Sequence, residues 1–314
     1  MKKRFILRAV KLKSCVWILL LIVPTALFSQ QVADTTYHPD IPDPAYKQGT
    51  GPVIFIDEGH FNFHTRDGRY RAFTTLLERD GYVVSGYQGE FEKKRLSEGK
   101  ILVISNALNV ANVNDWYLPT PSAFTKSEIK TVKKWVKRGG SLFLIADHMP
   151  MAGAAMELAA AFGFEFTNGF AMDTVARGPA FFRREDATLG ENLLTNGRDP
   201  SERVDQIVSF TGQAFRIPSD AAPVLTFGKN FINLQPDTAW VFDQTTAIDN
   251  VEGWSQGAYK KIRRGRVAVF GEAAMFTAQL AGPNQIKMGM NNEIAPENYK
   301  LLLNIIHWLD GKLE

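Results

Sequence analysis

Residues 53–64 read VIFIDEGHFNFH, in which an apolar run leads directly into Asp57, Glu58 and His60, with His64 four residues further on. A short apolar run of this kind predicts a strand buried on both faces, as in a parallel sheet. Open α/β sheets bind ligands beyond the carboxyl ends of such strands. The stretch therefore predicts a core strand with a ligand or catalytic site at its end. The competing interpretation is a turn whose carboxylates and histidines bond only to backbone.

The same pattern occurs at two later positions. Residues 141–149, SLFLIADHM, end in Asp147 and His148, and a strand predicted at 266–270 leads into Glu272. If the three strands are neighbours, their ends meet at one edge of the sheet. We therefore expect one crevice with five catalytic candidates: Asp57, His60, Asp147, His148 and Glu272. For Glu272 the alternative is a cap on a helix starting at Ala273, because a carboxylate stabilises a helix N-terminus.

Histidine and carboxylate side chains support two kinds of chemistry in such a crevice. Without a metal, His148 or His60 would act as a general base oriented by a neighbouring carboxylate. With a divalent metal such as zinc, a bound water would become the nucleophile. The metal ligands would then come from His60, His64, His148 and Asp57. His60 and His64 are four residues apart but lie in a predicted loop, so the helical metalloprotease geometry is not expected.

The order of the predicted elements defines the fold class. Helices are predicted at 69–80, after the capping box Thr125–Glu128, over 151–162 and after Pro296, and they alternate with apolar strands. This alternation predicts a flavodoxin-like α/β fold, a mostly parallel sheet with helices on both faces. Extra β-hairpins are expected in the second half. We expect a single domain over 52–314, with an irregular β-rich insertion at about 171–260.

The N-terminal residues 1–30 have the pattern of a secretory signal peptide. Six basic residues precede an apolar segment at 16–26, which is short for a membrane span, and small residues follow near Ser29. We predict cleavage there, export to the periplasm or the medium, and no stable membrane span afterwards; an uncleaved anchor is the alternative. Residues 31–51 carry three prolines and few apolar side chains, which predicts an extended linker.

Composition excludes several classes of function. The whole chain has 36 Lys and Arg against 33 Asp and Glu, but six of the basic residues and no acid lie in 1–30, so 30 basic and 33 acidic residues remain. No nucleic-acid partner is expected, because no basic stripe points to one and the sequence contains no RNA- or DNA-binding motif. Cys15 is the only cysteine, so the predicted mature chain has no disulfide, cysteine nucleophile or thiolate metal site.

The motifs DEGHFNFHT, ADHMPMAGAA and FGEAAMF resemble those of the class I glutamine amidotransferase-like superfamily, in particular its exported ThuA-like and GldG-like branches. The resemblance covers 52–170 and 266–313, and it implies the same α/β fold. In true amidotransferases a cysteine occupies the turn after this strand, whereas this chain has Asp147, His148 and Met149 there. Glutamine hydrolysis through a thioester is therefore excluded.

Two functions remain open. The first is an exported hydrolase that acts on a small polar or carbohydrate-type substrate, and loop aromatics near the strand ends could stack on a sugar: Phe61, Phe63, Trp116 and Tyr117. The second is a non-catalytic binding or scaffolding domain of the cell envelope. The pairs of acid and histidine at two strand ends favour the first, because a scaffold needs neither.

Overall fold

The structure is a computed structural model that describes residues 31–176 and 178–314. The predicted signal peptide, with Cys15, lies outside the described residues. The central sheet has nine strands, with the order β3-β2-β4-β5-β15-β14-β10-β6 and with β11 paired to β14. Their bounds are β2 Val53–Asp57, β3 Val83–Tyr87, β4 Ile101–Ser105, β5 Ser141–Ile145, β6 Glu165–Phe166, β10 Phe215–Arg216, β11 Ala222–Thr226, β14 Ser255–Ile262 and β15 Gly265–Phe270.

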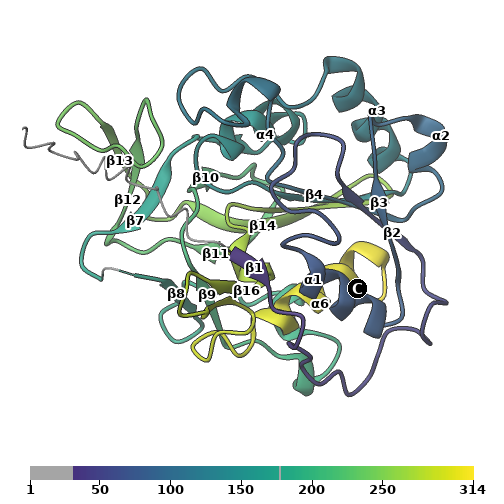
Figure 1. Cartoon of the computed structure of the whole chain (residues 1–314). Coiled ribbons are helices and arrows are strands. Elements are labelled where there is room, and N and C mark those ends of the chain that lie inside the picture. The colour runs from purple at the N-terminus through teal and green to yellow at the C-terminus, as the bar shows by residue number, and fades with distance from the viewer. Residues whose placement is uncertain (1–30, 177) are drawn as a thin grey trace, which may run out of the picture.

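Five neighbouring strands of this sheet are parallel to one another: β3, β2, β4, β5 and β15. The other four, β14, β10, β11 and β6, form an antiparallel edge. Helices cover both faces of this sheet, as predicted (Figure 1). The helices are α1 Arg71–Arg79, α2 Lys93–Leu96, α3 Lys126–Lys137, α4 Met151–Ala160, α5 Leu193–Asn196 and α6 Asn298–Asp310. Three short 3₁₀ turns are η1 Val110–Asn112, η2 Pro200–Glu202 and η3 Ala274–Phe276.

Alternate side chains of each parallel strand pack into two hydrophobic cores, one on each face of the sheet. Ile54 and Ile56 of β2 pack with α1 and α6, whereas Phe55 between them packs on the opposite face with residues of α3 and α4. Successive side chains of a strand point to opposite faces, so an unbroken apolar run is what a sheet covered on both sides requires. The apolar strands recognised in the sequence are therefore confirmed as the buried centre of an α/β fold.

The extra strands form three small antiparallel sheets. One contains β1 Gln31–Ala33, β16 Ala278–Ala281 and β17 Ile286–Gly289; another contains β7 Phe170–Asp173, β12 Phe231–Gln235 and β13 Ala247–Asn250; the third contains β8 Ala180–Arg183 and β9 Gln206–Ser209. Most of them fall in the second half of the chain, where hairpins were expected.

Residues 31–51 differ from the extended linker that their composition predicts. Strand β1 pairs with β16, and the backbone N–H of Ala45 donates to Asp80 Oδ1 at 2.7 Å. The Tyr46 ring packs edge-on against Tyr82, with the centroids 5.2 Å apart. These contacts attach the segment to the domain. Within the two described ranges, no helix is both long enough and apolar enough to cross a membrane.

Candidate functional site

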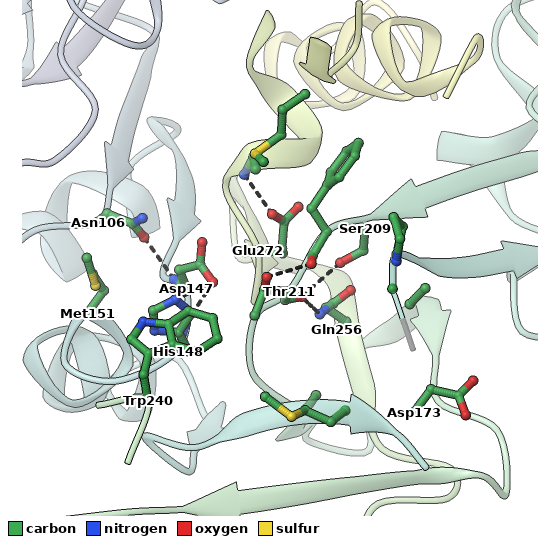
Figure 2. A pocket seen from close by; sticks show the side chains of 18 of the residues that line it. Asn106, Asp147, His148, Met151, Asp173, Ser209, Thr211, Trp240, Gln256 and Glu272 are labelled. Carbon is green, nitrogen blue, oxygen red and sulfur yellow. Dashed lines mark hydrogen bonds and ion pairs between the residues drawn. The ribbon is translucent and has the colours of Figure 1, made fainter. Parts of the chain in front are cut away.

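A cavity of about 850 Å³ lies at the carboxyl ends of β5 and β15. In the parallel pairing of these strands Phe270 lies opposite Ile145. Glu272 and Asp147 each follow two residues later, so the register brings the two carboxyl groups to the same place. Both residues and His148 border the cavity (Figure 2). The structure thus brings three of the five predicted residues together at one cavity.

Backbone and amide hydrogen bonds fix the turn that carries Asp147. The residue after β4, Asn106, accepts from the Asp147 N–H through its side-chain Oδ1 at 2.8 Å, and its own N–H donates to the Ile145 carbonyl. Asp147 Oδ1 in turn accepts from the His148 N–H at 2.9 Å. Asn106 adopts a φ of +48°, a conformation that asparagine tolerates better than most residues. The end of β4 thus positions the functional turn of β5.

The imidazole of His148 is held in one orientation. Its Nδ1 lies 2.7 Å from the Met149 carbonyl oxygen, so Nδ1 carries the proton and donates it. The ring stacks on Phe170, with the centroids 4.3 Å apart, and the edge of Trp240 packs against it at 4.7 Å. Nε2 lies 3.9 Å from Asp147 Oδ1. The geometry leaves the Nε2 lone pair as the reactive position beside the carboxylate.

The sequence left open whether Glu272 caps a helix or lies at the crevice, and in the structure it does both. Its carboxylate accepts hydrogen bonds from the N–H groups of Ala274, at 2.9 Å, and Met275, at 2.7 Å, at the start of η3. It also borders the cavity, although its own exposed fraction is 0%. Burial and the neighbouring Asp147 raise the pKa of Glu272 well above its ordinary value, against these backbone hydrogen bonds. The environment therefore favours the protonated, neutral acid.

Asp57 and His60 do not join this group, which corrects the expectation of a single crevice for all five residues. Strand β4 lies between β2 and β5 in the sheet. His60 Nδ1 lies 2.9 Å from both Asp57 carboxylate oxygens, and its Nε2 lies 2.8 Å from Glu128 Oε1. Neither residue borders the cavity. Both nitrogens of His60 are already bound to carboxylates, so the side chain links the end of β2 to the start of α3.

The charge of His60 follows from these partners. Burial opposes a charged imidazole, but the hydrogen bonds and charges of Asp57 and Glu128 outweigh it and raise the pKa of His60. Glu128, also buried, nevertheless has a lowered pKa, because Thr125, His60 and Phe91 donate to its carboxylate. The capping box predicted for α3 is present, and the same glutamate completes a buried ion triad that the sequence did not reveal.

His64 borders the cavity as a buried histidine. Burial and nearby Arg69 lower the pKa of His64 to about 3, so the ring is neutral. It packs on Tyr70 at 4.7 Å between centroids, and its buried Nδ1 has no hydrogen-bond partner among the described residues.

The predicted metal set is divided between two places. His64 and His148 border the cavity, whereas His60 and Asp57 bind each other outside it. Across residues 31–176 and 178–314, no three His, Cys, Asp or Glu side chains are grouped as metal ligands would be. The predicted four-residue metal centre is therefore wrong, because Asp57 and Glu128 engage both nitrogens of His60 away from the cavity.

Several lining residues carry no sequence signal of their own. The amides of Gln256 and Gln279 border the cavity, and in the described part of the chain the Oε1 atom of each is buried without a hydrogen-bond partner. Ser209 and Thr211 lie beside them, and Trp240 closes the side occupied by His148 (Figure 2). Of the four predicted loop aromatics, Phe63 and Trp116 line the cavity and Phe61 and Tyr117 do not.

No family model and no curated protein matches the chain. Among solved structures it is similar to the N-terminal domain of mmIFT52, with a TM-score of 0.56 and 14% identity over 82% of this chain and 96% of that one. A cytoplasmic protein from Salmonella typhimurium has a TM-score of 0.49 and 15% identity over 82% and 98% of the two chains. A ThuA-like protein from Bacteroides uniformis has a TM-score of 0.48 and 12% identity over 86% and 96%. At these identities the likeness concerns the fold alone.

Proposed function

We propose that the cavity binds a small polar, carbohydrate-type ligand and that the protein is a hydrolase acting on it through Asp147, His148 and Glu272. The observation that carries the proposal is the convergence of these three side chains on one aromatic-lined cavity. Its volume of about 850 Å³ falls in the range of small-molecule sites.

The lining suits a sugar better than an apolar ligand. Trp240, with 51% of its surface exposed, and Trp116 offer flat apolar faces, whereas Gln256 and Gln279 offer unpaired carbonyl oxygens to hydroxyl groups. A buried polar atom without a partner costs free energy, and a ligand hydroxyl that donates to it would remove this cost. Stacking surfaces together with amide acceptors are what a polyhydroxylated ring requires.

The acid–base assignment follows from the protonation of each group. The Met149 carbonyl holds Nδ1–H of His148, so in the neutral ring Nε2 is the nitrogen that can accept a proton from a water molecule. Glu272 has a raised pKa and can donate a proton to a leaving oxygen. Asp147, next to both, would stabilise the imidazolium that forms on His148. Most glycoside hydrolases likewise place two carboxyl groups at the bond that they cleave.

A second candidate is binding without catalysis, the alternative left open by the sequence. The observation in its favour is that Glu272 is fully buried and that both of its oxygens already accept backbone N–H groups. A carboxyl group so engaged can serve the fold alone. Ligand binding and turnover must therefore be measured separately.

The test is a thermal-shift screen of the purified chain against neutral mono- and disaccharides, followed by product analysis for every saccharide that binds. A ligand at 100 times its Kd should stabilise the folded state by about 2.7 kcal/mol. The hydrolase proposal expects a rise in Tm and a cleaved product. A rise in Tm without any product supports the binding domain instead, and no rise with any saccharide contradicts both.

We also propose that the protein is exported and that it belongs to the class I glutamine amidotransferase-like superfamily. The basic and apolar pattern of residues 1–30 supports secretion, and the three motifs around the strand ends support a place among the ThuA-like and GldG-like branches. N-terminal sequencing of the protein from a fractionated culture tests the first point. We expect a start near Gln30 or Gln31 outside the cytoplasm; an intact Met1 in the cytoplasmic fraction would refute it.

A further inference from the structure

The basic surface formed by α2, α3 and the turn after β14 is a second feature of the molecule, separate from the cavity. Helices α2 and α3 are adjacent (Figure 1). In residues 93–100 and 126–138 ten side chains are basic and two, Glu98 and Glu128, are acidic. The exposed or half-exposed cations of the basic surface are Lys93, Lys94, Lys126, Lys130, Lys133, Lys134, Lys137, Arg138, Arg263 and Arg264.

The ten cations of the basic surface share the lack of an acidic partner among the described residues. None of the ten forms an ion pair with any residue of the described ranges, whereas Arg184, Arg198 and Arg266 elsewhere each pair with an acid. Glu128 faces inward and binds His60. The residues from 31 onward carry fewer basic than acidic groups, 30 against 33, so the basic surface does not follow from bulk composition. Cations gathered on one face repel one another, and an anionic ligand would relieve this repulsion.

Part of the basic surface is concave. A cleft of about 470 Å³ is lined by Lys93, Ser97, Thr131, Lys134, Trp135 and Arg138. Gly99 and Gly140, which also line it, precede β4 and β5, so the cleft lies at the amino ends of strands whose carboxyl ends reach the cavity. The backbone of Arg264 lies close to Gly139 at the rim. The two sites are therefore at opposite ends of the sheet.

We propose that the basic surface binds a linear acidic polysaccharide, with one anionic unit in the cleft and the following units along α3. The 12-residue helix is about 18 Å long and carries cations from Lys126 to Lys137, which matches an extended chain of repeated charges. The carboxylate or sulfate groups of such a chain pair with lysine as point charges. This proposal concerns a different site and does not rest on the ligand of the cavity.

The chemistry of the surface favours this ligand over the other common polyanions. Single-stranded nucleic acids bind by stacking bases on exposed aromatic rings, but the aromatic residue of the cleft, Trp135, is only 8% exposed. None of the exposed large apolar side chains of the described residues lies on α2 or α3, so the surface offers nothing to insert into lipid.

The test compares two double variants of the full chain, K134Q/R138Q in the cleft and K47Q/K229Q on remote exposed lysines as a control with the same change in charge. Binding to heparin and to polygalacturonate is measured by titration calorimetry at low salt, with circular dichroism to confirm folding. We expect K134Q/R138Q to bind roughly tenfold more weakly than wild type and the control to stay within about twofold. Affinity should also fall steeply as salt is raised.

Three results would overturn the proposal. The first is no binding of wild type to either polysaccharide at low salt. The second is an equal loss of affinity in both double variants, which would indicate a bulk effect of charge. The third is tighter binding of wild type to double-stranded DNA or to phosphatidylglycerol vesicles than to either polysaccharide, which would assign the surface to another partner.

Discussion

The imidazole of His148 stacks on the ring of Phe170 with an interplanar angle of 15° and a centroid distance of 4.3 Å. This contact joins the strand-end turn of the parallel sheet to β7, an element of the β-rich second half. The side chain is 7% exposed, so it is packed and not a free loop histidine. A substitution at His148 therefore changes both the proposed chemistry and the packing, and the two effects have to be separated by design.

Two variants of His148 separate them. His148→Phe keeps a ring against Phe170 and removes the nitrogen atoms, whereas His148→Ala removes both. We expect both variants to lose turnover of any saccharide that wild type cleaves. His148→Ala should also lower the unfolding free energy by about 2–4 kcal/mol through the lost packing, and His148→Phe by clearly less. Thermal melts with parallel product assays measure this; retained turnover in folded His148→Phe would remove His148 from the mechanism.

Glu272 should make stability depend on pH in a known direction. Because its folded-state pKa is raised above the ordinary value of 4.5, its contribution to stability is full below that pH and is lost as pH rises through the folded pKa. Glu272→Gln cannot ionise, so the Tm of wild type minus that of Glu272→Gln should be largest near pH 4 and shrink as pH rises. The exposed Glu293→Gln is the control and should show no such trend. A Tm difference that grows with pH would contradict a neutral Glu272.

His60 should be structural. Replacing it leaves Asp57 and Glu128 as buried carboxylates without their cation, so His60→Gln should lose about 3–5 kcal/mol of unfolding free energy. Its raised pKa means that the contribution is full below 6.5 and is lost as pH rises through the folded value, so the deficit of the variant should be greatest in acid. Chemical denaturation at several pH values measures it.

The exposed His38→Gln is the matched control for His60→Gln and should be neutral. Folded His60→Gln should still bind the saccharide that wild type binds, because His60 does not border the cavity. Loss of binding at unchanged stability would return His60 to the functional site, where the sequence had placed it.

Trp240 offers a test of the ligand class. It and Tyr117 are both 51% exposed, but only Trp240 lines the cavity. We expect Trp240→Ala to weaken saccharide binding about five- to tenfold, equivalent to roughly 1 kcal/mol, and Tyr117→Ala to leave it unchanged. Titration calorimetry with the best saccharide measures both. Equal effects of Trp240→Ala and Tyr117→Ala on saccharide binding would show that Trp240 does not contact the ligand.

Much of the fold could be predicted because the parallel strands are covered on both faces and so appear as uninterrupted apolar runs. The buried strand that begins at Val53 and the Thr125–Glu128 capping box lie where the sequence placed them. Residues 238–242, TAWVF, have the composition of a strand, but they contain only an isolated bridge at Thr238, and Trp240 has a φ of +66°. Propensity alone could not detect that turn, because the packing of Trp240 on His148 and Phe170 sets it.

Part of the site was predictable because its residues directly follow the buried parallel strands. Asp147, His148 and Glu272 follow strands that prove to be neighbours, which their motifs indicated. Asp57 and His60 have the same local pattern, yet a carboxylate 68 residues away in the chain, Glu128, engages His60. Such a long-range partner leaves no local signal. Gln256 and Gln279 were missed because nothing in their own segments marks them as polar groups left unpaired in a cavity.

The most direct test of the central claim is a product assay on a library of defined oligosaccharides, run in parallel with wild type, Asp147→Asn and the control Asp67→Asn, an exposed residue outside the cavity. Mass spectrometry identifies any cleaved product. The account predicts cleavage of at least one saccharide by wild type and Asp67→Asn, and a loss of at least about a hundredfold in Asp147→Asn, because this variant lacks the carboxylate that stabilises the His148 imidazolium. Undiminished cleavage by folded Asp147→Asn would contradict it.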